Sequence, residues 1–388
     1  MIQRYVLLPI HKLKLLHLNV TKKLKYLIIL SLLPQYLGLL FLKNNPGLVE
    51  QYYSTGLYPV ISKLLNTSFK WSPVSLGDLL YIAAFIYITK WVIINWKHLR
   101  TQPRVWGLDV LTLVSVIYFL FHLCWGFNYY RESLHVSLSL KPTYTTEELK
   151  IITSKLVLKT NSLHLSIAND SLQKIDTPYS FNKMAVLSQQ GFKRLETEYP
   201  IFRHPGQNTK KSLFSTPLTY MGFGGYLNPF TLEAQVNSVM PKSSMITTIA
   251  HEQAHQLGYA AENEANFIGF LACVHNKDLF YQYAGYTFAL RYCLQEMSRR
   301  DIDCYKNTVK SIHPGILKKF QETSEFWKSY NNPLEPLIKR FYNNFLKANN
   351  QEKGIESYSY VVALLVNYLH TKQPLLNTYF RRRTNSKE

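Results

Sequence analysis

The residues best suited to chemistry in this 388-residue chain form one short block, His251-Glu252-Gln253-Ala254-His255. Two histidines four residues apart on a helix lie on the same face, close enough to bind one ion. Imidazole suits zinc, which in catalytic sites takes three protein ligands and one water. Glu252 follows the first histidine, where its carboxylate is placed to take a proton from that water. The spacing therefore predicts a zinc site with His251 and His255 as ligands and Glu252 as general base.

The third ligand is expected from the block Glu262-Asn263-Glu264-Ala265-Asn266. Gly258 precedes this block and can end the first helix and turn the chain, so that the third ligand approaches from another direction. Glu262 shares a helix face with Asn266, whose amide is placed to hold a ligand by hydrogen bonding, whereas Glu264 points to a different side. Glu262 is the favoured ligand and Glu264 is the alternative. Most glutamates are exposed helix carboxylates without such a role.

The pattern H-E-x-x-H followed by E-x-x-A-N resembles the gluzincin-like zinc peptidases, in which the acid that opens the second motif is the third ligand. The resemblance implies His251, His255 and Glu262 as metal ligands and Glu252 as base. The chain is also similar to an uncharacterised bacterial membrane family with three N-terminal spans and one such domain. The segments that carry this resemblance are WGFNYYR at 125–131, NPFTLEAQVN at 228–237, HEQAHQLG with ENEAN, and SYSYVVALL at 357–365. The gap between His255 and Glu262 is shorter than in many better-known peptidases.

Three apolar stretches in the first third of the chain, at about 24–42, 76–96 and 106–127, are predicted to cross a membrane. Each is close to the roughly 20 residues that a helix needs to span a bilayer, and tryptophans lie near the ends of the last two. Helix-breaking or charged residues interrupt them at Pro34, Asp78, Lys90 and Asp109. We therefore expect a membrane anchor over residues 1–127 and a zinc-metallopeptidase-like domain over residues 128–388.

The distribution of lysine and arginine predicts the orientation of these spans. Basic residues precede the first span or lie at its start, and others lie between the second and third spans. The loop over residues 43–73 is longer and carries fewer basic residues. The basic residues at the first span are Arg4, Lys12, Lys14, Lys22, Lys23 and Lys25. Loops rich in lysine and arginine stay in the cytoplasm. No cleavage site follows the first span, so it is an anchor and not a signal peptide. The domain is expected outside the cytoplasm, at the bacterial inner (cytoplasmic) membrane.

The formal net charge of +20 raises nucleic acid as a partner. The excess is spread along the chain, and no nucleic-acid motif accompanies it, so we expect an anionic lipid bilayer as the partner and no nucleic acid. None of the four cysteines forms a C-x-x-C pair, which argues against a structural zinc site of the cysteine type.

The predicted fold is mainly α: three transmembrane helices and an α+β zincin-like domain with a small sheet and an active-site helix. A Thr-x-x-Glu start predicts a helix over residues 145–158, and residues 212–236 suggest strands and turns. The segment 220–237 could supply an edge strand for extended substrate or an ordinary hairpin. Residues 361–369 are apolar but short for a fourth crossing. Downstream donors for an oxyanion are His275, Tyr283 and Tyr286, each of which also fits a structural role.

Together these patterns predict a membrane-anchored zinc peptidase acting on a peptide or protein substrate, with Zn²⁺ as cofactor. The alternative is a non-catalytic, metal-binding membrane sensor or scaffold that keeps the peptidase frame. A third interpretation, that the motif is accidental, leaves a purely structural protein. The presence of Glu252 favours the enzyme, because a protein without turnover has no chemical need for that carboxylate.

Overall fold

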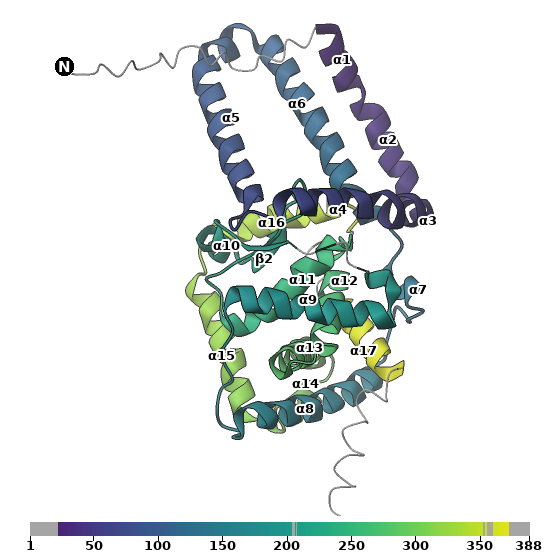
Figure 1. Cartoon of the computed structure of the whole chain (residues 1–388), viewed down its shortest axis with the longest axis vertical. Coiled ribbons are helices and arrows are strands. Elements are labelled where there is room, and N and C mark those ends of the chain that lie inside the picture. Colours follow the sequence, from purple (N-terminus) through teal and green to yellow (C-terminus); the bar gives the residue numbers. More distant parts are fainter. Residues whose placement is uncertain (1–21, 204–205, 207, 352–353, 355–359, 372–388) are drawn as a thin grey trace, which may run out of the picture.

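The computed structural model describes residues 22–203, 206, 208–351, 354 and 360–371. A group of apolar helices from the N-terminal third stands on a larger, mainly helical globular part (Figure 1). The basic residues Arg4, Lys12 and Lys14 and the start of the segment 357–365 lie outside the described residues.

The first third of the chain forms the helical segments α1 (Lys22–Leu30), α2 (Leu32–Lys43), α3 (Pro46–Leu48), the π-helical η2 (Val49–Leu57), α4 (Tyr58–Phe69), α5 (Leu76–Thr101), α6 (Pro103–Cys124) and the 3₁₀ turn η3 (Gly126–Tyr130). The globular part adds α7 (Leu134–Ser137), α8 (Thr146–Ala168), α9 (Phe181–Glu198), η4 (Pro200–Phe202), α10 (Ser215–Met221), α11 (Lys242–Gln256), α12 (Glu262–Val274), α13 (Leu279–Arg300), α14 (Ile302–Lys310), α15 (Pro314–Ser329), α16 (Glu335–Ala348) and α17 (Val361–Thr371). Its strands are β1 (Thr209–Lys211), β2 (Gly225–Leu227) and β3 (Ala234–Val236).

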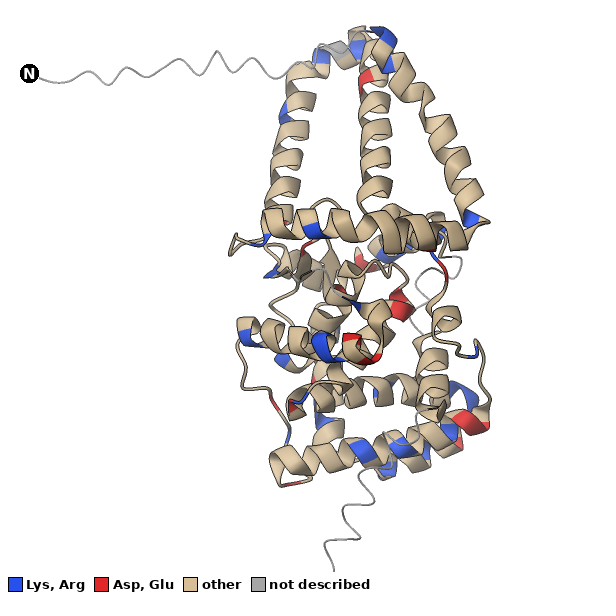
Figure 2. Cartoon of the chain, turned by 45° about the vertical axis from the view of Figure 1, so that its right-hand side comes forward, with Lys and Arg blue, Asp and Glu red and all other residues tan. Residues whose placement is uncertain are grey.

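Three helical stretches of the described chain are long and apolar enough to cross a membrane, Lys22–Lys43, Leu76–Lys97 and Pro103–Cys124. This confirms the three apolar helices expected from the sequence; the third begins and ends slightly earlier than expected, because η3 takes up the residues after Cys124. Only 6% to 11% of their apolar windows is buried inside the protein, which leaves their sides free to face lipid. Figure 2 shows few charged residues along them. Lys25 pairs with Asp109, which offsets the charge in the third span.

The belt segment consists of residues 46–69 and comprises α3, η2 and α4. The sequence prediction grouped it with the anchor. In the structure α4 runs across the ends of the apolar helices, between them and the globular part (Figures 1 and 2). Its buried residues bond to the globular part: Tyr58 donates to the carbonyl of Gln256 at 3.0 Å, and Asn66 to that of Gly206 at 3.2 Å. The belt segment is therefore packed against the globular part, and the domain boundary expected at residue 127 stays a prediction.

Asp78 also ties the two parts together, and this explains an acidic residue at the start of an apolar helix. Its side chain is fully buried and accepts hydrogen bonds from the hydroxyl of Ser212 at 3.0 Å and the backbone N–H of Leu213 at 2.7 Å. Tyr226 on β2 also donates to it. A buried carboxylate needs such partners, so Asp78 marks where α5 meets the globular part.

The small sheet has the order β1-β3-β2, with β3 parallel to β1 and antiparallel to β2. Expected strands and turns over residues 212–236 are found only in part, because α10 occupies residues 215–221. A small sheet within a mainly helical fold is confirmed, and its order leaves β2 at an edge.

The core of the globular part lies between α8, α9, α11, α12, α13 and α17. α8 begins with the expected capping box, in which Thr145 and Glu148 exchange side-chain and backbone hydrogen bonds. α17 is buried along residues 361–369. The apolar segment that was short for a fourth crossing is thus a core helix, which explains its high hydrophobicity without any contact with lipid.

Candidate metal centre

Helix α11 brings the two histidines of the motif together as their spacing predicts. His251 and His255 lie one turn apart, with their Nε2 atoms 3.1 Å from each other. The side chain of His251 is 14% exposed and that of His255 is 8% exposed, so both rings are largely shielded from solvent. The two Nε2 atoms are therefore close enough to bind the same ion.

The turn after α11 brings the next helix back onto it. Gly258 has φ of +85°, a left-handed conformation that suits glycine at a helix end. α12 then packs closely on α11 at Gly269, where a Cβ atom would lie 3.0 Å from the backbone nitrogen of His251. The short gap between the motifs is therefore a tight turn between two packed helices, and it leaves the start of α12 beside the imidazole pair.

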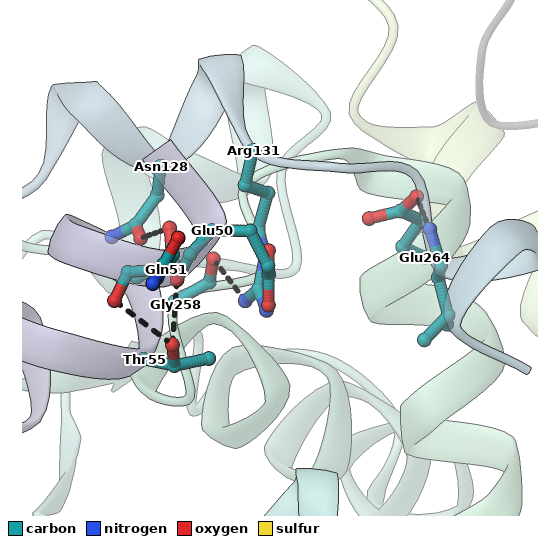
Figure 3. A network of polar contacts seen from close by, with 9 residues as sticks. Glu50, Gln51, Thr55, Asn128, Arg131, Gly258 and Glu264 are labelled. Atoms are coloured by element: carbon teal, nitrogen blue, oxygen red, sulfur yellow. Dashed lines mark hydrogen bonds and ion pairs between the residues drawn. The ribbon is translucent and has the colours of Figure 1, made fainter. Parts of the chain in front are cut away.

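Glu262, the first residue of α12, points at both histidines. Its Oε2 atom lies 3.2 Å from Nε2 of His251 and 3.6 Å from Nε2 of His255. Glu264 is turned elsewhere: its Oε1 accepts the backbone N–H of Leu134 at 2.7 Å (Figure 3). Burial raises the pKa of Glu264 to about 7. Of the two acids that the sequence left open, the structure brings Glu262 to the histidines.

Two neighbouring groups orient these side chains. Tyr342 on α16 donates to Oε1 of Glu262 at 2.7 Å, which leaves Oε2 directed at the imidazoles. The carbonyl of Tyr259 lies 2.7 Å from Nδ1 of His255, which leaves Nε2 of that ring as the free ligand atom. Such outer contacts commonly hold metal ligands in place. The role expected of Asn266 is not seen, since its amide nitrogen has no hydrogen-bond partner among the described residues.

Glu252 also lies close to the imidazole pair. A carboxylate oxygen of Glu252 and one nitrogen of each histidine lie within 4.8 Å of one another. Its Oε1 packs against Gly225 of β2, where a Cβ atom would come within 2.8 Å, and its Oε2 is buried without a hydrogen bond from the described chain. Burial raises the pKa of Glu252 to about 7, against the opposing effect of the two histidines. This carboxylate is suited to take up a proton near neutral pH.

The carboxylates of Glu252 and Glu262 both lie near the imidazole pair, but their surroundings shift their pKa values in opposite directions. Although burial opposes ionisation, contact with the two histidines holds the pKa of Glu262 well below its usual range. Burial lowers the pKa of His255, but the hydrogen bond and negative charge of Glu262 have a larger effect, so that the pKa rises to about 9. An acid that stays ionised is suited to bind a cation, and one with a raised pKa is suited to exchange a proton.

The three proposed ligand atoms fit zinc. Two ligands on a tetrahedral zinc with bonds of about 2.05 Å lie about 3.3 Å apart. The observed separations between Nε2 of His251, Nε2 of His255 and Oε2 of Glu262 are 3.1, 3.2 and 3.6 Å. Oε2 of Glu262 is also buried without a well-aligned hydrogen bond from the described residues. Two nitrogens and one carboxylate oxygen are a usual donor set of catalytic zinc.

A cleft of about 960 Å³ gives access to the site. His251, Glu252 and Asn266 line it, together with Gly222–Gly225 next to and on the edge strand β2. Further walls come from α13, α15 and α16, with Arg291, Tyr292, Trp327, Lys339 and Tyr342 among the lining residues. β2 lies at an edge of the sheet, and its first residue, Gly225, lines this cleft.

None of the three oxyanion donors suggested by the sequence lines this cleft. His275 contacts the carbonyl of Leu271 and the carboxylate of Glu198, at 2.8 and 3.0 Å. Tyr286 is buried in the core, and Tyr283 lines a neighbouring pocket. Arg291 and Tyr292, which share α13, are among the hydrogen-bond donors that line the cleft.

Residues of the first third of the chain, whose contacts the sequence did not predict, hold the turn after α11 in place. Arg131 donates to both carboxylate oxygens of Glu50, at 2.9 and 2.6 Å, and to the carbonyl of Gly258 at 3.0 Å (Figure 3). Its guanidinium also lies 3.9 Å from the ring centre of Tyr259. The ring of Trp125 meets that of His255 edge-on, with centres 6.0 Å apart. The segment WGFNYYR thus tethers the turn after α11 to the belt segment.

The fold is that of a mainly helical protein with three apolar helices suited to a membrane and a small sheet beside a His-His-Glu cluster. The chain belongs to the DUF3810 family, described as "Protein of unknown function", whose family model matches residues 53–366. This confirms the expectation of an uncharacterised family. No curated protein and no solved structure matched the chain.

The hydroxyl of Tyr342 can be tested directly. Replacing Tyr342 with phenylalanine removes the hydrogen bond to Glu262 and is expected to weaken zinc binding by roughly 10- to 100-fold, as for other outer contacts of metal ligands. Competition with a chromophoric chelator measures this on the full chain. Tyr305→Phe on α14 is the matched control, and equal affinities of the two variants would show that Tyr342 does not orient the ligand.

Proposed function

We propose that this chain is a membrane-anchored zinc-dependent peptidase. The observation that carries the proposal is the convergence of Nε2 of His251, Nε2 of His255 and Oε2 of Glu262 within 3.6 Å of one another, with Glu252 beside them on an open cleft. The zincin-like character of the domain, the zinc and the peptide or protein substrate all belong to this proposal. The orientation of the domain outside the cytoplasm, at the bacterial inner membrane, also belongs to it and is supported by the basic loops.

Zinc, when bound by these three residues, polarises a carbonyl and acidifies a water. The residues of the chain supply the rest. Glu252 takes the proton of the attacking water at a carboxylate oxygen and passes it to the leaving amine of the peptide. β2 offers an edge strand whose backbone can pair with the substrate on the cleft side.

The environment of Glu252 supports an enzyme over a non-catalytic sensor or scaffold. Metal binding alone needs His251, His255 and Glu262, whereas a buried carboxylate near that cluster has an energetic cost. Glu252 is 3% exposed, and its Oε2 has no hydrogen-bond partner within the described structure. A proton-transfer role accounts for a group placed at such a cost.

The test uses the full chain purified in lipid nanodiscs. We expect near-stoichiometric zinc by elemental analysis and cleavage of a mixed peptide library, followed by mass spectrometry. A strong chelator should stop the cleavage, and added zinc should restore it. Folded protein that neither holds nor takes up zinc would refute the proposal, and zinc without cleavage of any peptide would favour the sensor or scaffold.

A further inference from the structure

The belt segment and α16 expose apolar side chains beside the membrane-crossing helices. On α4 and the residue before it, Leu57, Val60 and Leu64 are 45%, 65% and 65% exposed. They follow the spacing i, i+3, i+7 and so form one stripe. Tyr58, Ser62 and Asn66 of the same helix are buried. With 3.6 residues per turn the two sets lie on opposite faces, so the exposed stripe points away from the globular part.

Helix α16 repeats this pattern. Leu334, Leu337 and Phe341 are 64%, 64% and 76% exposed and share the same spacing. A different face of the helix carries Tyr342, which reaches Glu262, and Leu346, which is fully buried. α16 is thus amphipathic, and its apolar stripe has no protein partner in the described chain.

The position of α16 identifies what its stripe can meet. Phe345 contacts Phe121 near the end of α6, with ring centres 6.2 Å apart, and also Tyr129 of η3 at 6.4 Å. α16 therefore lies beside the C-terminal end of the third apolar helix, at about the height of α4 in Figure 1. If the apolar helices span a bilayer, its headgroup layer lies at this level.

We propose that the stripes of α4 and α16 together form a surface seated in the headgroup region of the bilayer. Amphipathic helices with leucine and phenylalanine on one face and basic residues beside it bind in this way, with the apolar face at the boundary between headgroups and acyl chains. Lys63 and Arg340 are exposed on these helices, and α4 carries no acidic residue. The anchor then holds the globular part flat against the membrane instead of on a flexible stalk.

This surface joins the bilayer to the candidate metal centre, although the inference does not depend on the peptidase function. α4 bonds to the end of the zinc helix through Tyr58, and α16 bonds to Glu262 through Tyr342. α16 also supplies Lys339 to the cleft wall. One wall of the cleft is therefore formed by a helix that lies in the membrane surface.

Quenching by lipid-borne bromine tests the proposal on the full chain in nanodiscs. An environment-sensitive fluorescent amino acid replaces Leu64 or Leu337 in separate samples, and nanodiscs are made with ordinary or brominated phosphatidylcholine. The matched control replaces Leu158, which is 55% exposed on α8 at the end of the globular part away from the apolar helices. We expect a loss of emission with bromine at positions 64 and 337, strongest for bromine near the headgroup end of the chain, and none at 158.

The alternatives give different signals. Blue-shifted emission at 64 and 337 that bromine does not quench would mean that another protein surface, such as a second copy of the chain, covers the stripes, and the proposal would fail. Emission as red as that at position 158 would mean that water covers them, with the same consequence. Labelling Phe341, also exposed on the stripe, repeats the measurement should the substitution at Leu337 disturb folding.

Discussion

Replacing Glu252 with glutamine is expected to lower peptide cleavage by on the order of 10²- to 10⁴-fold while zinc stays bound. An amide has nearly the same shape as the carboxylate and fits the space against Gly225, but it cannot accept the proton of the attacking water. Zinc should remain because His251, His255 and Glu262 are untouched. Rates on a peptide found in the library screen, together with the zinc content of the same sample, measure both parts.

Glu264→Gln is the matched control for this variant. Glu264 is buried on the neighbouring helix and its pKa is also raised to about 7, but its carboxylate faces the backbone of Leu134. Glutamine keeps an oxygen for that N–H, so cleavage should continue. If Glu252→Gln cleaves as fast as this control, Glu252 is not the base.

The second large effect is expected from His255→Ala, which should abolish stoichiometric zinc binding. The substitution removes one of three ligands, and the loss in affinity should exceed the roughly 100-fold that outer contacts contribute. Because a bound ion stabilises the folded state, zinc should raise the melting temperature of the parent protein and leave that of the variant unchanged. Thermal unfolding with and without zinc, and elemental analysis, provide the readouts.

His275→Ala is the control here, since His275 is also partly buried, directly after α12, but bonds to Leu271 and Glu198 outside the cleft. This variant should keep zinc and its thermal shift. Zinc retained at full occupancy in His255→Ala would place the ion elsewhere and remove the basis of the proposed activity.

Local spacing was enough to predict the parts of the site that lie on one helix. His251 and His255 meet because a helix repeats every 3.6 residues, whatever surrounds it. In the same way, Gly258 ends α11, the Thr145–Glu148 box begins α8, and three apolar stretches form helices long enough for a bilayer. Each of these features depends on residues within a few turns of one another, so the amino-acid order alone determines them.

The choice between Glu262 and Glu264 needed the tertiary structure, because both lie in the first turn of α12. The packing of Gly269 on α11 and the contact of Leu134 with Glu264 decide which acid faces the histidines. Tyr342 reaches Glu262 from 80 residues away. No local pattern reports a hydrogen bond between such distant segments.

Hydrophobicity likewise left the place of each apolar segment open. Residues 361–369 and the three apolar helices are similar in character, yet the first is buried in the core while the others expose their sides. The belt segment was grouped with the anchor, although Tyr58 bonds to the end of α11. The sequence thus determined the apolar helices and the placing of His251 and His255 on one face of a helix. Only the fold decided which faces meet, because burial depends on contacts between segments far apart in the chain.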